Sequence, residues 1–324
     1  MCTAISFKTK DHYFGRTLDL EYHYNESVVV TPRNFPFCFR NGIEIKSHPA
    51  IIGIATIVED YPLYYEATNE KGLSIAGLNF PDNTYFPPKS DALQNVAPFE
   101  FIPWILTQCE NISDVKKLFK ETNLANIDFS PEMKAATLHW LISDRENSIT
   151  VEAVKEGLKV YDNPVGVLTN NPPFDYQITN LSNYLNLTAE IPQNRFSSLL
   201  DLKPYSKGMG AVGLPGDLSS VSRFVKAAFT KMNSVCGESE EESVSQFFHI
   251  LGSVDQQKGC VHLGNGKYEI TVYTSCCNTD KGIFYYTTYE NSQISAVDMH
   301  REDLDSTELV SYTLVTEQQI NRIN

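Results

Sequence analysis

The sequence lacks the features that mark metal enzymes, membrane proteins and nucleic-acid-binding proteins. Its seven histidines are scattered without HExxH spacing and no two cysteines have CxxC spacing, so we predict no metal ion. The longest apolar runs, such as residues 50–55, are far too short to cross a bilayer, and no basic and apolar leader stretch precedes them, which favours the cytoplasm. With 26 Lys and Arg against 40 Asp and Glu, the net charge of −14 repels nucleic acid and anionic membranes. We therefore expect neither as a partner.

The seven cysteines form no even disulfide framework. An odd number of cysteines in a chain of this length fits a reducing compartment, where most of them serve as small core residues. Cys276 and Cys277 are adjacent in a strand-like run, so their side chains point to opposite faces and make a poor disulfide pair.

The order of apolar patterns predicts strands, helices, strands, helices and strands. Strands are predicted where β-branched and aromatic runs are bounded by turn residues, at 3–8, 13–20, 27–31, 51–58, 63–68, 73–80, 135–143, 148–154, 158–161, 165–170, 268–276, 283–288 and 294–297. Helical periodicity marks 98–123, with Ser113 as a cap, and also 174–185, 220–232 and 241–251. Without repeats or a clear linker, this order predicts one layered α+β domain over residues 1–324.

One long stretch fits neither pattern. Residues 186–217 contain Pro, Asn and Gly and are expected to form an excursion from the core, of the kind that lines a site or contacts another subunit. The stretch includes Gly208 to Gly213, which matches GxGxxG. Because no strand precedes it and Leu214-Pro215-Gly216 follows it, we do not expect it to bind a dinucleotide.

The first two residues carry the most distinctive chemistry. If Met1 is removed, Cys2 carries a thiol and a free α-amine on one residue. Their pKa values lie close together in model peptides, so the amine can take the proton of the thiol near neutral pH. A thiolate is the reactive nucleophile, and this arrangement would need no distant histidine. A lone cysteine is nevertheless more often a small buried residue at the start of a strand, and Cys2 by itself does not decide between the two.

Several further stretches decide in favour of the nucleophile. They are Cys2-Thr3, Phe14 to Asp19, Asn69 to Leu73, Gly77 to Pro81, Gly166 to Asn170, Gly213 to Asp217 with Ser222-Arg223-Phe224, Tyr273 to Cys276 and Tyr289 to Asn291. In this order and over essentially the whole chain, they resemble the choloylglycine hydrolases, the bile salt hydrolases and penicillin V acylases of the N-terminal nucleophile hydrolase superfamily.

This resemblance implies a fold and a set of roles. The fold would be an αββα sandwich of two antiparallel sheets between helical layers. Cys2 would be the nucleophile with its amine as the base, and Arg16 would favour the thiolate. Asp19 would hydrogen-bond the Cys2 amine, the amides of Asn79 and Asn170 would hold the oxyanion, and Arg223 would lie near the sulfur. Each of these residues also has an ordinary structural explanation, as a strand, turn or helix-start residue. No cofactor is implied.

The resemblance also implies a substrate class. Asn79 matches bile salt hydrolases, whereas penicillin V acylases tend to have tyrosine there, so conjugated bile salts are the first choice. An apolar wall for the sterol is expected from strand ends and loops of the same region, although core packing is an equally good explanation for each member: Leu18, Leu20, Tyr22, Tyr24, Val58, Tyr61, Tyr65 and Phe129.

Two alternative functions, the conjugate preference and the subunit contact remain to be considered. The first alternative is a penicillin V acylase or a broad N-acyl amide acylase. The second, of a different class, is a non-catalytic binding protein on the same fold. The preference between glycine and taurine conjugates is not evident from these residues. The family implies a homotetramer, and residues 186–217 are the candidate subunit contact. Because Cys2 directly follows Met1, loss of one methionine is expected to activate the chain.

Overall fold

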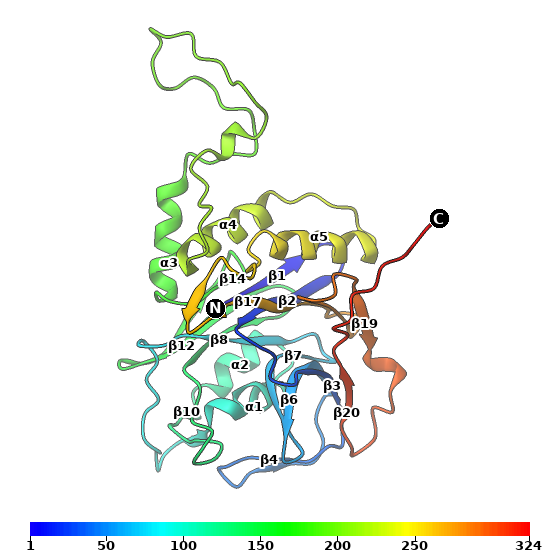
Figure 1. The fold of residues 1–324 in the computed structure, drawn as a ribbon. Coiled ribbons are helices and arrows are strands. Elements are labelled where there is room, and N and C mark those ends of the chain that lie inside the picture. The colour runs from blue at the N-terminus through cyan, green and yellow to red at the C-terminus, as the bar shows by residue number, and fades with distance from the viewer.

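The computed structural model describes all of residues 1–324 and arranges them in four layers (Figure 1). Two antiparallel sheets face each other in the middle. Helices α4 (Ser220–Asn233) and α5 (Glu240–Gly252) cover the outer face of one sheet, and α1 (Phe101–Leu106) and α2 (Ile112–Leu118) cover the other (Figure 1). This arrangement confirms the predicted αββα sandwich.

The first sheet has six strands and contains the N-terminus. Its order is β14 (Val167–Leu168), β1 (Cys2–Lys8), β2 (His12–Leu20), β17 (Ile270–Asn278), β18 (Ile283–Thr288) and β19 (Ser295–Asp298). The first six residues of β1 are all buried, since helices cover one face of this sheet and the second sheet covers the other. Cys2 therefore begins a central strand, and its register partner across to β2 is Leu18.

The second sheet has eight strands. Its order is β13 (Gly157–Asp162), β12 (Ser148–Val154), β11 (Leu138–Ser143), β8 (Ser74–Asn79), β7 (Tyr61–Asn69), β6 (Ile51–Val58), β3 (Ser27–Thr31) and β20 (Val310–Thr313). The sequence analysis missed β20, because this edge strand is almost entirely exposed and has no apolar alternation.

Shorter elements complete the fold. They are the strands β4 (Phe37–Cys38), β5 (Glu44–Ile45), β9 (Gln94–Val96), β10 (Thr122–Leu124), β15 (His262–Gly264) and β16 (Lys267–Tyr268), the helix α3 (Phe174–Asn180), and 3₁₀ turns at Pro98–Glu100, Leu181–Tyr184, Met209–Ala211 and Met299–Arg301. The longest helix has 14 residues, and none of the helices combines the length and apolar character needed to span a bilayer.

The predicted helical region 98–123 is two short helices rather than one segment, and its predicted cap is wrong. Asn111, not Ser113, is the N-cap of α2, because Asn111 has extended backbone angles and its side chain accepts from the Asp114 N–H. Ser113 lies inside the helix. At α5, Ser239 is the N-cap and forms a capping box with Glu242, in a first turn that also contains Glu240 and Glu241.

Residues 186–217 leave the body of the molecule as a long arm between α3 and α4 (Figure 1). Several of its apolar side chains are more than four-fifths exposed, among them Phe196 at 82%, Leu199 at 91% and Tyr205 at 88%. The GxGxxG match at Gly208 to Gly213 lies in this arm and follows no strand, so the structural setting of a dinucleotide site is absent there.

Candidate active site

Cys2 lies at the point where β1, β2 and the chain after β14 meet. It is only 3% exposed. The structure holds the chain with Met1 in place, so the nitrogen of Cys2 is a backbone amide. That nitrogen donates to Asn170 Oδ1 at 2.8 Å. Removal of Met1 would turn this nitrogen into the free amine that the proposed chemistry needs.

Asn170 is fixed on several sides. Its Oδ1 also accepts from Arg223 Nη2 at 2.8 Å, its Nδ2 donates to the carbonyl oxygen of Asn79 at 2.7 Å, and its N–H donates to Ser220 Oγ at 2.8 Å. The Asn170 side chain thus joins Cys2, Arg223 and Asn79. Of the two asparagines, Asn170 is the one with a buried side chain. The side chain of Asn79 is exposed and has one long hydrogen bond, 3.4 Å from Thr137 Oγ1.

Arg223 is buried in the first turn of α4, with 1% of its surface exposed, so it is not a solvated helix-start residue. Its Nη1 donates to the carbonyl oxygen of Cys2 and to Thr3 Oγ1, each at 2.6 Å. Burial lowers the pKa of Arg223, while the nearby Asp19 and Cys2 act in the opposite direction. The guanidinium therefore ties α4 to the start of β1.

The predicted hydrogen bond of Asp19 to the Cys2 amine requires a chain without Met1, so it stays a prediction. The Asp19 carboxylate does not contact the Cys2 nitrogen in the chain that carries Met1, because Oδ1 accepts from Thr271 Oγ1 at 2.7 Å and Oδ2 accepts from Thr17 Oγ1 at 3.2 Å. The backbone carbonyl of Asp19 instead accepts from the Met1 ammonium at 2.7 Å. Burial raises the pKa of Asp19, and the Arg223 cation, 3.9 Å from Oδ2, opposes this shift.

The Met1 ammonium also forms an ion pair with Glu269, a residue that the sequence analysis missed. Burial lowers the pKa of this terminal amine, against the influence of Cys2 and Asp19. The Met1 amine therefore loses its proton more readily here than in water.

Arg16 is fully buried between the sheets rather than on a strand surface. Its Nη1 donates to the carbonyl oxygens of Gly77 and Tyr65, and its Nε lies 3.8 Å from Glu66 Oε2. Burial disfavours its charge, but the attraction of Cys2, Tyr273 and Glu66 is stronger and raises the pKa of Arg16. Arg16 thus remains a cation next to Cys2.

Glu66 is the second residue that sequence reasoning missed. It is 1% exposed and accepts from Tyr273 Oη at 2.7 Å through Oε2, and its Oε1 has no hydrogen-bond partner. Burial raises the pKa of Glu66 from 4.5 to about 7, although Arg16 and Tyr273 oppose the shift. The signal in the sequence was a carboxylate at an inward position of the strand around Tyr64 and Tyr65.

The eight residues of the predicted apolar wall fall into separate groups. Leu18 is buried, and Leu20 and Tyr65 pack against the same core between the sheets. Tyr61 and Phe129 pair at 6.4 Å between ring centroids, beside Phe99, which the sequence analysis missed. In the remaining group, Tyr22 and Tyr24 are 46% and 40% exposed with rings 4.6 Å apart, and Val58 is half-buried at the end of β6.

Of the predicted catalytic residues, Asn170 and Arg223 thus bond the backbone of Cys2, and Asn79 takes part through its carbonyl oxygen. Arg16 and Asp19 are buried close by without a hydrogen bond to Cys2. No group of three or more His, Cys, Asp or Glu side chains is arranged to hold a metal ion. Two cavities, of about 410 and 1140 Å³, are lined by other residues.

Comparison with known proteins identifies the family. The model of the linear amide C–N hydrolases, choloylglycine hydrolase family, matches residues 2–312. The chain is 56% identical over 324 residues to a bile salt hydrolase/transferase from Lactiplantibacillus plantarum, covering 100% of both chains. It is 39% identical to a bile salt hydrolase/transferase from Clostridium perfringens, again covering 100% of both.

Solved structures agree. The C2A mutant of conjugated bile acid hydrolase from Clostridium perfringens superposes with a TM-score of 0.92 at 38% identity and covers 100% of both chains. The penicillin V acylase from Agrobacterium tumefaciens has a TM-score of 0.76 at 16% identity, covering 96% of this chain and 90% of that one, so it shares the fold. Together with the buried N-terminal cysteine, these matches show that the chain belongs to the choloylglycine hydrolase family of linear amide C–N hydrolases.

Proposed function

We propose that this chain hydrolyses the amide bond of glycine- or taurine-conjugated bile salts, with Cys2 as the nucleophile. The observation that carries the chemistry is the position of Cys2, whose nitrogen and carbonyl oxygen are both held by buried side chains, Asn170 and Arg223. The substrate class is supported by the names of relatives that match over the full chain at up to 56% identity.

The first half of the reaction forms a thioester. The Cys2 α-amine takes the thiol proton, and the sulfur attacks the carbonyl carbon of the amide. The oxyanion is held by amide donors of the Asn79 and Asn170 region, where one donor contributes about 3 kcal/mol in other hydrolases. The Cys2 ammonium then protonates the departing nitrogen as the C–N bond breaks, and glycine or taurine leaves.

The second half releases the bile acid. The Cys2 amine, neutral again, takes a proton from water, and the hydroxide attacks the thioester carbonyl. The C–S bond breaks and the sulfur recovers the proton. The buried cations Arg16 and Arg223 stabilise the negative charge that appears on sulfur at both stages.

This mechanism requires that Met1 is absent. With Met1 in place the Cys2 nitrogen is an amide and has no basic lone pair. The terminal ammonium, which belongs to Met1, donates to the carbonyl oxygen of Asp19 and pairs with Glu269. A chain that retains Met1 is therefore expected to be inactive.

The runner-up is a penicillin V acylase or a broad N-acyl amide acylase. Its support is the shared fold at 16% identity, whereas the relatives with full coverage and higher identity are named for bile salts. The remaining alternative is a non-catalytic binding protein. It predicts that wild type and Cys2→Ala show the same rate of amide hydrolysis. Turnover of glycocholate compared with penicillin V decides between the two enzymatic alternatives.

A homotetramer assembled through the arm at residues 186–217 is part of this proposal. The arm leaves the body of the molecule and exposes large apolar side chains, including Phe196 and Leu199. An exposed apolar surface of this kind is typical of a subunit contact. A cytoplasmic location is also proposed, because seven free cysteines fit a reducing compartment.

Intact-mass spectrometry tests the central proposal. We expect a mass without Met1, labelling of Cys2 by iodoacetamide that glycocholate suppresses, and release of glycine. A chain that lacks Met1 but whose Cys2 stays unlabelled, with no glycine released, would contradict the proposed chemistry.

A further inference from the structure

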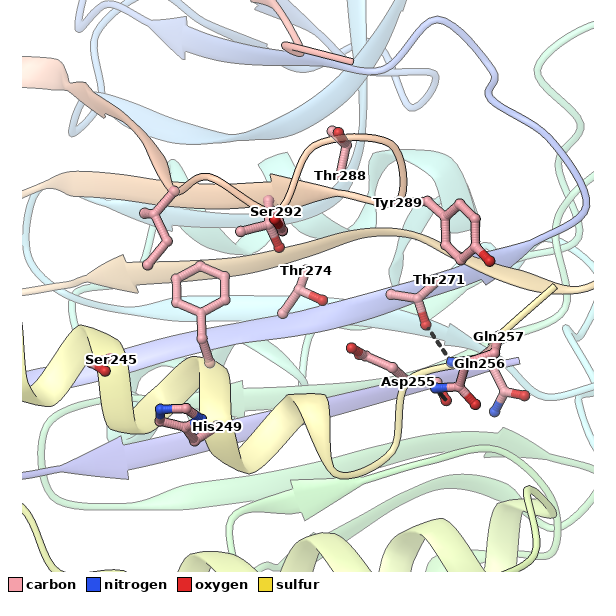
Figure 2. A pocket seen from close by; sticks show the side chains of 13 residues that line it. Ser245, His249, Asp255, Gln256, Gln257, Thr271, Thr274, Thr288, Tyr289 and Ser292 are labelled. Atoms are coloured by element: carbon pink, nitrogen blue, oxygen red, sulfur yellow. Dashed lines mark hydrogen bonds between the residues drawn. The ribbon is translucent and has the colours of Figure 1, made fainter. Parts of the chain in front are cut away.

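A cavity of about 410 Å³ lies between α5 and the first sheet and is lined by none of the six residues assigned to catalysis (Figure 2). It is bounded by α5, by the turn that follows α5, by β17, by the end of β18 and by the segment after β18. Its walls are mostly polar, with hydroxyls from Thr274, Thr287 and Ser292. The volume is in the range of small-molecule sites in proteins.

The turn after α5 places at this cavity two residues whose side chains contain buried polar atoms without hydrogen-bond partners. Gln256 is 1% exposed, and neither its Nε2 nor its Oε1 has a hydrogen-bond partner. The neighbouring Asp255 has a buried Oδ1 that is also unpartnered. Buried polar atoms without partners are rare in folded proteins and cost about 1–3 kcal/mol each, so a wall with three of them indicates a site that binds something.

The carboxylate of Asp255 at this wall has no cation beside it to compensate its charge. Burial, followed by the like charge of Asp19, raises the pKa of Asp255 to about 7, and no cation acts against the shift. His249 on α5 and Tyr289 are the other titratable side chains that line the cavity with Asp255. A carboxylate in such surroundings attracts a ligand that brings its own positive charge.

We propose that this cavity is a second binding site, for a small molecule that carries a primary ammonium group and a neighbouring oxygen. The ammonium supplies N–H donors to Asp255 Oδ1 and Gln256 Oε1, and the oxygen accepts from Gln256 Nε2. An amino alcohol or an amino acid has this combination of groups.

The site shares a hydrogen-bond network with the catalytic region. The N–H of Gln256 donates to Thr271 Oγ1 at 2.8 Å (Figure 2), and Thr271 Oγ1 in turn donates to Asp19 Oδ1 at 2.7 Å. The Thr271 N–H also donates to the Gln256 carbonyl oxygen at 3.1 Å. Gln256, which the proposed ligand contacts, therefore lies two hydrogen bonds from Asp19.

The test measures binding of ethanolammonium by NMR titration of the full chain, with no bile salt present and at constant ionic strength. Without an acyl donor no turnover occurs, so the result does not depend on the proposed function. We expect a Kd of about 1 mM, as suits a ligand of so few atoms. Ethylene glycol, which lacks the ammonium group, is expected to show no saturable binding.

Variants locate the binding. Asp255→Asn removes the charge and Gln256→Met removes the amide, and each should raise the Kd about tenfold or more. Asp91→Asn, at an exposed position, is the matched control and should bind like wild type. Circular dichroism confirms that each variant is folded. Binding that is unchanged in folded Asp255→Asn and Gln256→Met, or no binding to wild type, would overturn the proposal.

Discussion

Arg223 and Cys2 are 221 positions apart in the sequence, yet Nη1 of Arg223 donates to the carbonyl oxygen of Cys2 at 2.6 Å. The same guanidinium donates to Asn170 Oδ1, which accepts from the Cys2 nitrogen. Both backbone polar groups of the nucleophile are therefore tied to one buried cation, directly or through Asn170. The geometry of the N-terminus depends on α4 as much as on β1.

Arg223→Lys keeps the positive charge and loses the planar set of donors, so it should lower kcat/KM by about 100-fold. A lysine ammonium is a single point charge and does not reach Cys2, Thr3 and Asn170 in the present arrangement. Steady-state hydrolysis of glycocholate measures the effect. The control is Arg301→Lys, whose side chain is 83% exposed and which should retain wild-type kinetics. Near-wild-type kcat/KM for Arg223→Lys would show that charge alone is sufficient.

Asn170 has both an acceptor, which faces Cys2, and a donor, which faces Asn79. Asn170→Asp keeps the acceptor and loses the donor. If the donor stabilises the oxyanion, both Asn170→Asp and Asn170→Ala should lower kcat by about 100- to 1000-fold.

Rates for these two variants are compared with those of Asn183→Ala, an exposed asparagine whose amide donates only to Asn180. A high rate for Asn170→Asp together with a low rate for Asn170→Ala would assign Asn170 to holding the Cys2 nitrogen and would rule out the donor role.

Glu66 should make stability depend on pH. Its pKa rises on folding from 4.5 to about 7, mainly through burial, against the effects of Arg16 and the Tyr273 hydroxyl. The folded chain thus binds the proton more tightly than the unfolded chain. The resulting stability is complete below pH 4.5 and is lost as pH rises through about 7, a change of about 3 kcal/mol.

Glu66→Gln cannot titrate and should remove this contribution. Urea unfolding at about pH 4.5 and about pH 7.5 should show that the variant gains about 3 kcal/mol relative to wild type between the two conditions. Glu308→Gln, at an exposed position, is the control. Parallel pH dependence of Glu66→Gln and wild type would mean that Glu66 does not titrate in this range.

The arm should control assembly. Phe196→Ser with Leu199→Ser replaces side chains that are 82% and 91% exposed, so the fold of one chain should be unaffected. Light scattering should shift from about 146 kDa, four times the chain mass of 36.5 kDa, toward the mass of one chain.

The matched control for assembly is Ile320→Ser with Ile323→Ser, which replaces two exposed apolar side chains outside the arm. It should leave the mass unchanged. A wild-type chain that scatters as a monomer would refute the tetramer.

The sequence by itself determined the layered fold and the identity of the nucleophile. Strands such as β3 and β6 were predicted to the residue, because their buried runs of Val and Ile are bounded by turn residues. The position of Cys2 next to Met1, with the ordered family motifs, was equally a property of the sequence. Patterns of this kind are local, so they can be recognised without knowing which segments meet.

Only the tertiary structure decided what surrounds Cys2. Arg16 and Arg223 are ordinary charged residues in the sequence and become fully buried cations because two sheets and a helix close over them. With Met1 in place the Asp19 carboxylate bonds Thr271, the sequence marks Glu66 only as a carboxylate at an inward strand position, and Glu269 gives no local signal of a role. Hydrogen bonds over more than 200 positions depend on strand register and helix docking, and no pattern within one segment encodes them.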